Sequence, residues 1–222
     1  MAELILIYGK SGSGKSRSLK GFAADEIFLI NVEGKRLPFK SKFNYQIVTD
    51  SYETIFAKLA GMASKTKIKT VVIDDAGYLL TNNFMRGHAG GRKGAQVFDL
   101  YNDLADNFWG LFKFVKNKLP SDVIVYLMMH EDTNDNGMTK LKTIGKLLDD
   151  KACLEGMVTV CLRCMSEDGK HFFRTKTDGF DITKSPEDMF EADEIENDLK
   201  AVDTIIRQYW DLIPTNSESE DK

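Results

Sequence analysis

One short segment of the chain constrains its fold more than any other: a glycine-rich run between an apolar stretch and a helical pattern. Residues 4–8 read LILIY, residues 9–16 read GKSGSGKS, and residues 17–24 follow with a helical pattern. The run matches G-x-x-x-x-G-K-S, in which backbone N–H groups wrap a phosphate and the next helix points its positive end at the same anion. The sequence therefore predicts an α/β fold with a phosphate-binding loop after its first strand.

The loop also predicts which ligand it holds. Lys15 supplies a cation for the β- and γ-phosphates of a nucleotide, and the Ser16 hydroxyl is a ligand for Mg²⁺. We therefore expect ATP and Mg²⁺ as the bound molecules. The residues expected to contact the nucleotide are Gly9, Lys10, Ser11, Gly12, Ser13, Gly14, Lys15, Ser16 and Arg17.

Further apolar runs predict the rest of the sheet. Strands are expected at residues 27–32, 45–48, 71–73 and 123–129. Helical periodicity separates them, which predicts a mainly parallel sheet flanked by helices, with right-handed crossovers. We expect one domain over residues 1–213 and a disordered acidic tail over 214–222.

Several local patterns complete the expected element map. The glycine-containing residues 81–96 and the polar residues 131–137 are interpreted as long loops. Asp50 and Glu53 have the spacing of a capping box. The remaining expectations are a helix at 144–152, a C-terminal hairpin of 157–163 with 171–175, and a closing helix at 191–210.

Carboxylates at strand ends are candidates for catalysis. Asp74 directly follows the buried run Val71–Ile73 and is the expected second ligand for Mg²⁺. A group that orients the attacking water is also needed, and Glu33 and Asp75 compete for this role. Neighbouring residues of a strand point to opposite faces, whereas Glu33 closes another core strand at the same edge of the sheet. Glu33 is therefore favoured, with a solvated turn residue as the alternative.

A histidine ends another expected strand at the same edge. His130 follows residues 123–129 and could sense the γ-phosphate and relay its presence to the next loop. The alternative is a surface histidine with no role in the chemistry.

Basic residues in the two expected loops favour nucleic acid as a partner. Residues 83–94 contain Arg86, Arg92 and Lys93 and no acidic residue, and the second loop, taken here as residues 131–145, offers Lys140 and Lys142. Flexible positive loops suit contacts with a phosphate backbone, so we expect single-stranded DNA to bind there. Mobile, solvated loops are the alternative.

Composition limits the class of protein further. The chain has 222 residues and a formal net charge of -4, which argues against binding nucleic acid through bulk charge. No apolar run approaches the roughly 20 residues of a membrane span, so we expect a cytoplasmic protein with no membrane partner. Cys161 and Cys164 have zinc-like spacing, but their apolar strand pattern favours buried thiols over a metal site.

Together these segments resemble the RecA-like P-loop ATPases, in particular the short RecA-core recombination ATPases encoded by bacteriophages. The resemblance rests on residues 9–16, FLINVEG at 28–34, VVID at 71–74, the strand ending on His130, and residues 173–190. It implies that Glu33 is the catalytic base and that His130 couples ATP to DNA binding. It also implies that Lys176 and Lys184 act across a subunit interface; ordinary surface lysines are the alternative. His130 stands where RecA itself carries an amide.

The sequence thus predicts a Mg²⁺-dependent ATPase, stimulated by single-stranded DNA, that acts in phage recombination or replication. We expect a homo-oligomer, as a ring or filament, in the cytoplasm of a bacterial or phage-infected cell, with a single-strand-binding or annealing protein as a possible partner. Two other classes stay open. One is a P-loop ATPase that serves a protein assembly or packaging machine without binding DNA. The other is a small-molecule kinase, which would need a lid with converging arginines.

Overall fold

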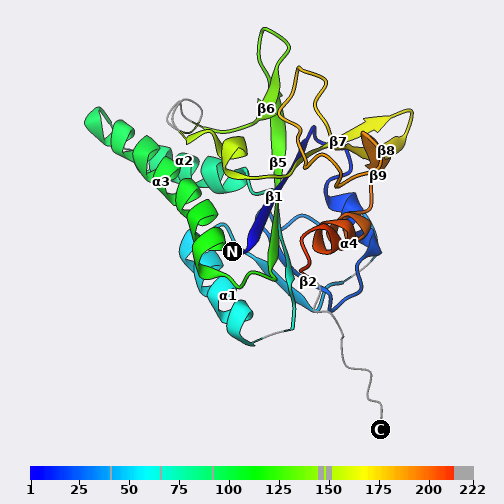
Figure 1. Cartoon of the computed structure of the whole chain (residues 1–222). Coiled ribbons are helices and arrows are strands. Elements are labelled where there is room, and N and C mark those ends of the chain that lie inside the picture. Colours follow the sequence, from blue (N-terminus) through cyan, green and yellow to red (C-terminus); the bar gives the residue numbers. More distant parts are fainter. Residues whose placement is uncertain (41, 66, 92, 145–147, 149–151, 213–222) are drawn as a thin grey trace.

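A single mixed sheet organises the computed structural model, which describes the chain except residues 41, 66, 92, 145–147, 149–151 and 213–222. Within the described residues the sheet has nine strands in the order β3-β2-β4-β5-β1-β7-β8-β9, with β6 paired to β5 (Figure 1). The strands are β1 (Glu3–Gly9), β2 (Ile27–Asn31), β3 (Tyr45–Val48), β4 (Thr70–Asp74), β5 (Ile124–Thr133), β6 (Thr139–Leu141), β7 (Cys161–Glu167), β8 (Lys170–Arg174) and β9 (Glu194–Glu196).

The central strands run parallel, as the sequence predicts. β1 lies between β5 and β7 and is parallel to both, and β4 joins β5 to β2 in the same direction. Apolar side chains on both faces of β1 are covered, so residues 4–8 are all buried. Parallel pairing brings the carboxyl ends of β1, β4 and β5 to one edge, where Gly9 lies opposite His130.

Helices cover both faces of this sheet (Figure 1). The helical elements are η1 (Ser16–Gly21), α1 (Tyr52–Lys65), α2 (Tyr78–Ala89), α3 (Ala95–Lys118), η3 (Leu154–Met157) and α4 (Leu199–Tyr209). Residues from α1, α2 and α3 share one core cluster with one face of the sheet, and residues from η1 and α4 share another with the opposite face. Among the described residues, no helix is both long enough and apolar enough to cross a membrane.

The expectation of a long loop at residues 81–96 is wrong. Most of this range belongs to α2, and only a short connection precedes α3. The glycines suggested a loop, but Gly87 serves helix packing instead. A Cβ atom at Gly87 would lie 2.6 Å from a methyl carbon of Leu100, so the missing side chain lets α2 approach α3 closely.

The second expected loop, at residues 131–137, begins as strand and only its second part is a turn. β5 continues to Thr133 and pairs antiparallel with β6, so Glu131 lies opposite Leu141. Asn134 closes the turn, because its side-chain Oδ1 accepts hydrogen bonds from the N–H groups of Asn136 and Met138. The polar composition reflects a hairpin that extends beyond the parallel sheet, seen at the top of Figure 1.

Helix boundaries also differ from the expectations. Ser51, not Asp50, caps α1, since its hydroxyl accepts the N–H of Thr54 at 3.2 Å. α4 begins only after Asp198, whose carboxylate accepts two backbone N–H groups, because part of the acidic run before it forms β9. The helix after the phosphate loop is a short 3-10 helix that ends at Gly21.

The last residue of this 3-10 helix packs closely against the start of α4. A Cβ atom at Gly21 would lie 2.7 Å from a carboxylate oxygen of Asp198, so the position accepts only glycine without rearrangement. Most of the helix expected at 144–152, and the tail at 214–222, lie outside the described residues.

Candidate nucleotide-binding site

The phosphate loop connects β1 to η1 at the carboxyl edge of the sheet. Gly12 and Gly14 have φ angles of 81° and 109°, which side-chain-bearing residues rarely adopt. A Cβ atom at Gly14 would also lie 2.8 Å from Nδ1 of His171. Glycine is therefore required here both by the backbone conformation and by the close approach of β8.

Lys15 is buried inside this loop. Its Nζ donates hydrogen bonds to the carbonyl oxygens of Gly9 and Lys10, each at 2.8 Å. Burial lowers the pKa of Lys15, because desolvation disfavours the charged form. Both partners are uncharged carbonyls, so a phosphate in the cavity would compete effectively for the ammonium group.

Ser16 and Asp74 meet at the side of the loop. The Ser16 hydroxyl donates to Oδ2 of Asp74 at 2.7 Å, and Oδ1 of Asp74 accepts the N–H of Asp75. Burial raises the pKa of the Asp74 carboxyl, and a cation beside it would reverse that effect. One hydroxyl and one carboxylate fit Mg²⁺, which is usually bound by few protein oxygens together with substrate phosphates. Among the described residues, no cluster of three or more His, Cys, Asp or Glu offers a complete protein cage for a metal.

Asp75 lies beside this pair with a left-handed backbone, at a φ of 59°. Its Oδ2 is 2.7 Å from Nζ of Lys35, and its Oδ1 is 3.4 Å from Nε2 of His130. Burial raises the pKa of Asp75, but the hydrogen bonds from His130 and Lys35 outweigh it and lower the pKa to about 2. The carboxylate is thus charged and held between two basic side chains.

One cavity of about 330 Å³ unites most of the residues predicted to bind the nucleotide or the metal or to act in catalysis. Lys15, Ser16, Asp74, Asp75 and His130 all line it, together with Ser11, Gly12, Gly14 and Arg17 of the phosphate loop region. The same cavity is lined by four residues that sequence reasoning did not assign to it: Lys35, Arg36, Pro38 and His171. No motif marks these four, because they reach the cavity only through the turn after β2 and the pairing of β7 with β8.

Glu33, the favoured catalytic base, is not among the residues that line this cavity. Its Oε1 accepts a hydrogen bond of 2.8 Å from Nδ2 of Asn82, on α2. The same amide group donates to Asp50, which also pairs with Arg86 at 2.6 Å. Glu33 therefore belongs to a polar cluster with α2, a helix that the sequence did not predict.

Residues from β7, β8 and the turn after β9 support the phosphate loop from behind. The carbonyl oxygen of Ser13 lies 3.2 Å from Sγ of Cys164 and 2.8 Å from Nδ1 of His171. Asn197 donates to the Cys164 sulfur at 3.3 Å and accepts from Arg17 at 3.2 Å. Burial raises the pKa of Cys164 to about 11, so its thiol stays protonated as the donor to Ser13. This part of the chain holds the loop in its phosphate-binding shape.

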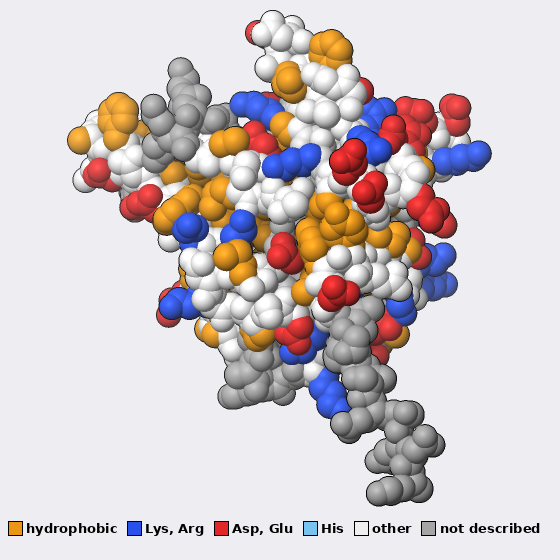
Figure 2. Space-filling view, viewed as in Figure 1, with side chains coloured by type: hydrophobic (Ala, Val, Ile, Leu, Met, Phe, Trp, Pro, Cys, Tyr) orange, Lys and Arg blue, Asp and Glu red, His pale blue; other side chains and the backbone are white. Residues whose placement is uncertain are grey.

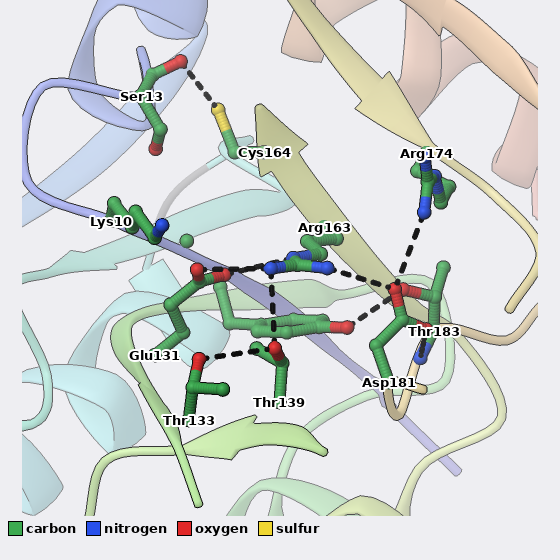
Figure 3. A network of polar contacts seen from close by, with 12 residues as sticks. Lys10, Ser13, Glu131, Thr133, Thr139, Arg163, Cys164, Arg174, Asp181 and Thr183 are labelled. Carbon is green, nitrogen blue, oxygen red and sulfur yellow. Dashed lines mark hydrogen bonds and ion pairs between the residues drawn. The ribbon is translucent and has the colours of Figure 1, made fainter. Parts of the chain in front are cut away.

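A buried charged cluster lies beside the loop, next to Cys164 on β7 (Figure 3). Arg163 on β7 donates to both carboxylate oxygens of Glu131, at 2.9 and 3.0 Å, and to Asp181 at 3.3 Å. The side chains of Glu131 and Asp181 are 4% and 0% exposed. Arg163 also donates to Thr139, so the cluster fixes the β5–β6 hairpin to β7. We call these residues the Arg163 cluster.

The residues predicted to contact DNA are scattered. Arg86 is tied to Asp50, Arg92 lies outside the described residues, and Lys93 is exposed before α3. Lys140 and Lys142 lie on and just after β6.

The two residues predicted to act across an interface are also placed. Lys176 pairs with Asp193 at 3.2 Å, and Lys184 bridges Cys161 through its backbone.

A basic segment after β2 escaped the sequence analysis. Residues 35–42 read KRLPFKSK, with four cations and no carboxylate. Arg36, Lys40 and Lys42 are exposed, while Phe39 packs edge-on against the buried Phe43. Residues from this segment and the ends of β2 and β3 line a groove of about 590 Å³ beside the nucleotide cavity. Four cations on either side of a short apolar run, with no carboxylate among them, were the available signal.

The fold and this site define a P-loop nucleotide-binding protein. A family model described as AAA domain matches residues 2–192, so the chain belongs to that family and is an AAA-type ATPase. No curated protein matches the chain.

Proposed function

We propose that this protein is a RecA-like ATPase of phage type that hydrolyses ATP with Mg²⁺ and acts on single-stranded DNA in recombination or replication. The observation that carries the ATPase part is the single cavity lined by Lys15, Ser16, Asp74 and Asp75. It combines a cation for phosphates, oxygen ligands for a metal, and a second carboxylate, paired with Lys35 and His130, at the edge where ligands of parallel sheets bind.

In the proposed mechanism each side chain has one task. Lys15 and the loop N–H groups bind the phosphates, while Ser16 and Asp74 hold Mg²⁺, which when bound neutralises charge on the phosphate oxygens. Of the two candidate bases, Asp75 is favoured by its place in the cavity, since Glu33 faces Asn82 instead. Asp75 would orient the attacking water and accept its proton.

His130 provides the proposed link to DNA. It lies within β5, directly before the part of the strand that pairs with β6, and it contacts Asp75. A change at the terminal phosphate would reach the β5–β6 hairpin through this one strand. Lys140 on β6 and Lys142 directly after it are proposed contacts for the DNA backbone.

The basic segment 35–42 is the second proposed DNA surface. Its exposed cations border a groove next to the nucleotide cavity, and phosphate-backbone binding depends on such local charge rather than on net charge. In contrast, acidic and basic side chains are interspersed over the face seen in Figure 2.

Replacing both Lys40 and Lys42 with alanine should weaken binding of single-stranded DNA. The matched control replaces the exposed Lys58 and Lys118, on α1 and α3.

Assembly is part of the proposal. Lys176 and Lys184 are proposed to complete the site of a neighbouring subunit in a ring or filament, as positive residues supplied in trans stabilise transferring phosphates. A single-strand-binding or annealing protein is the proposed protein partner.

The deciding experiment measures ATP hydrolysis by the purified protein with and without single-stranded DNA, with Lys15→Ala as the blank. A rate that rises with DNA supports the proposal. A rate indifferent to DNA contradicts the DNA role and favours the second candidate, an ATPase of a protein assembly or packaging machine. That candidate has one observation in its favour: the 74% exposed Phe98 at the start of α3, an apolar side chain suited to a protein contact.

A further inference from the structure

Lys35 reaches the nucleotide cavity from the turn after β2 rather than from the phosphate loop or the end of β4. The chain leaves β2, turns at Gly34 with a φ of 67°, and returns across the edge of the sheet. The side chain of Asn31 donates a hydrogen bond of 2.7 Å to the carbonyl oxygen of Lys35. The backbone of Lys35 is therefore fixed against the end of β2, while its side chain extends toward β4.

The Lys35 side chain is held by contacts that can be exchanged. Its Nζ lies 2.7 Å from Oδ2 of Asp75 and 5.0 Å from the ring centroid of Tyr78. The side chain is 56% exposed. Only the lysine end of this pair is exposed, because the side chain of Asp75 is 11% exposed. Asp75 keeps His130 at 3.4 Å when Lys35 moves, so the lysine can leave Asp75 when a stronger anion compensates for the lost pair.

The cavity would supply that anion. Lys35 lines it together with Lys15, Ser16 and Asp74, the residues assigned to the phosphates and Mg²⁺. The terminal phosphate of a nucleoside triphosphate carries more charge than one carboxylate and has three strong acceptor oxygens. A diphosphate lacks this group, so only a triphosphate would draw Lys35 away from Asp75.

Building on the proposed function, we propose that Lys35 exchanges Asp75 for the terminal phosphate of a bound nucleoside triphosphate. The exchange selects triphosphate over diphosphate, and it frees one oxygen of Asp75 to hold the attacking water. His130 remains on the other oxygen, so the carboxylate keeps one basic neighbour. In this role Lys35 touches the substrate, and Asp75 gains its function only when the substrate is complete.

Binding of two ligands tests this exchange. The dissociation constants of ADP and of a non-hydrolysable ATP analogue, each with excess Mg²⁺, are measured by calorimetry for the wild type and for Lys35→Ala. Loss of one charge-assisted hydrogen bond should weaken the analogue by about tenfold and ADP by less than about twofold. Lys35→Arg should restore most of the preference, because it keeps a cation on a long side chain.

A second variant removes an alternative explanation. In Lys35→Ala the unpaired Asp75 could repel the terminal phosphate even if Lys35 never contacts it. The effect of Lys35→Ala is therefore measured again in an Asp75→Asn background. A persistent loss of analogue binding supports the direct contact, and a loss that disappears overturns it.

Control variants separate this proposal from the ATPase assignment. Lys69→Ala removes a lysine from another half-exposed ion pair, with Asp122 at 2.8 Å, and should change neither constant. Lys15→Ala should weaken both ligands. A wild type that binds neither nucleotide contradicts the proposed function itself. Equal weakening of ADP and the analogue by Lys35→Ala contradicts only the exchange.

Discussion

Two charged groups flank the phosphate loop, and they differ in how their charges are balanced. In the Arg163 cluster, one guanidinium contacts two carboxylates that solvent hardly reaches, and Arg174 and a threonine hydroxyl add further contacts (Figure 3). In the nucleotide cavity, Lys15 donates hydrogen bonds to neutral carbonyls, and the exposed Lys35 pairs with the nearly buried Asp75. Buried and mutually paired charges resist rearrangement, whereas loosely partnered charges are available to a ligand. Substitutions in the first group should therefore change stability, and those in the second should change activity.

Arg163→Ala should lower the free energy of unfolding more than any other variant proposed here. It leaves Glu131 and Asp181 buried without their main cation, which costs about 3–5 kcal/mol of unfolding free energy. Urea denaturation measures the loss. As a control, the double variant Arg163→Met with Glu131→Gln should recover part of it, because the buried charge on Glu131 is removed as well. A loss below about 1 kcal/mol would mean that the cluster is solvated in solution.

Lys15→Ala should reduce activity strongly and stability little, the reverse of the effect expected for Arg163→Ala. Hydrolysis should fall by about a hundredfold or more, the size expected when a main charge donor to the phosphates is removed. The melting temperature without nucleotide should fall little, because the variant also relieves the cost of burying an ammonium group. A large drop in melting temperature would show that Lys15 stabilises the empty loop. Lys15 would then contradict the expectation that the loosely paired charges of the cavity affect activity rather than stability.

Asn197→Ala should give an intermediate result. The side chain is 4% exposed and links Cys164 to Arg17 behind the phosphate loop. Removing it should cost about 1–2 kcal/mol of unfolding free energy and weaken ADP binding several-fold. Asn197→Asp is the matched control, because it keeps the acceptor for Arg17 and removes the donor to the sulfur. Unchanged ADP affinity in Asn197→Ala would mean that the loop keeps its shape without this support.

Arg86→Ala should have the smallest effect. Arg86 is 55% exposed in its pair with Asp50, so thermal unfolding should register a change below about 1 kcal/mol. A larger change would mean that the Arg86–Asp50 pair contributes to the free energy of unfolding as the Arg163 cluster does, and not as an ordinary surface ion pair.

Local chemistry was the part of this molecule that could be predicted from sequence. The phosphate loop and its strand are neighbours in the chain, so a single motif reveals them. Asp74 could be predicted from its place at the end of a second buried strand, and the structure places it beside Ser16. Lys35, His171 and Asn197 come to the loop through tertiary pairing, which no spacing encodes. Gly87 of α2 was misleading for the same reason, since it packs against Leu100 on another helix.

The uninterrupted course of β5 has a mechanical consequence. The strand is parallel to β1 up to His130, then leaves the parallel sheet and carries one arm of the β5–β6 hairpin. The strand continues without a break from the cavity wall at His130 into the hairpin, so a tilt of the strand at His130 would also displace the Asn134 turn. The hydrogen bonds from Arg163 to Glu131, next to His130, would oppose that displacement.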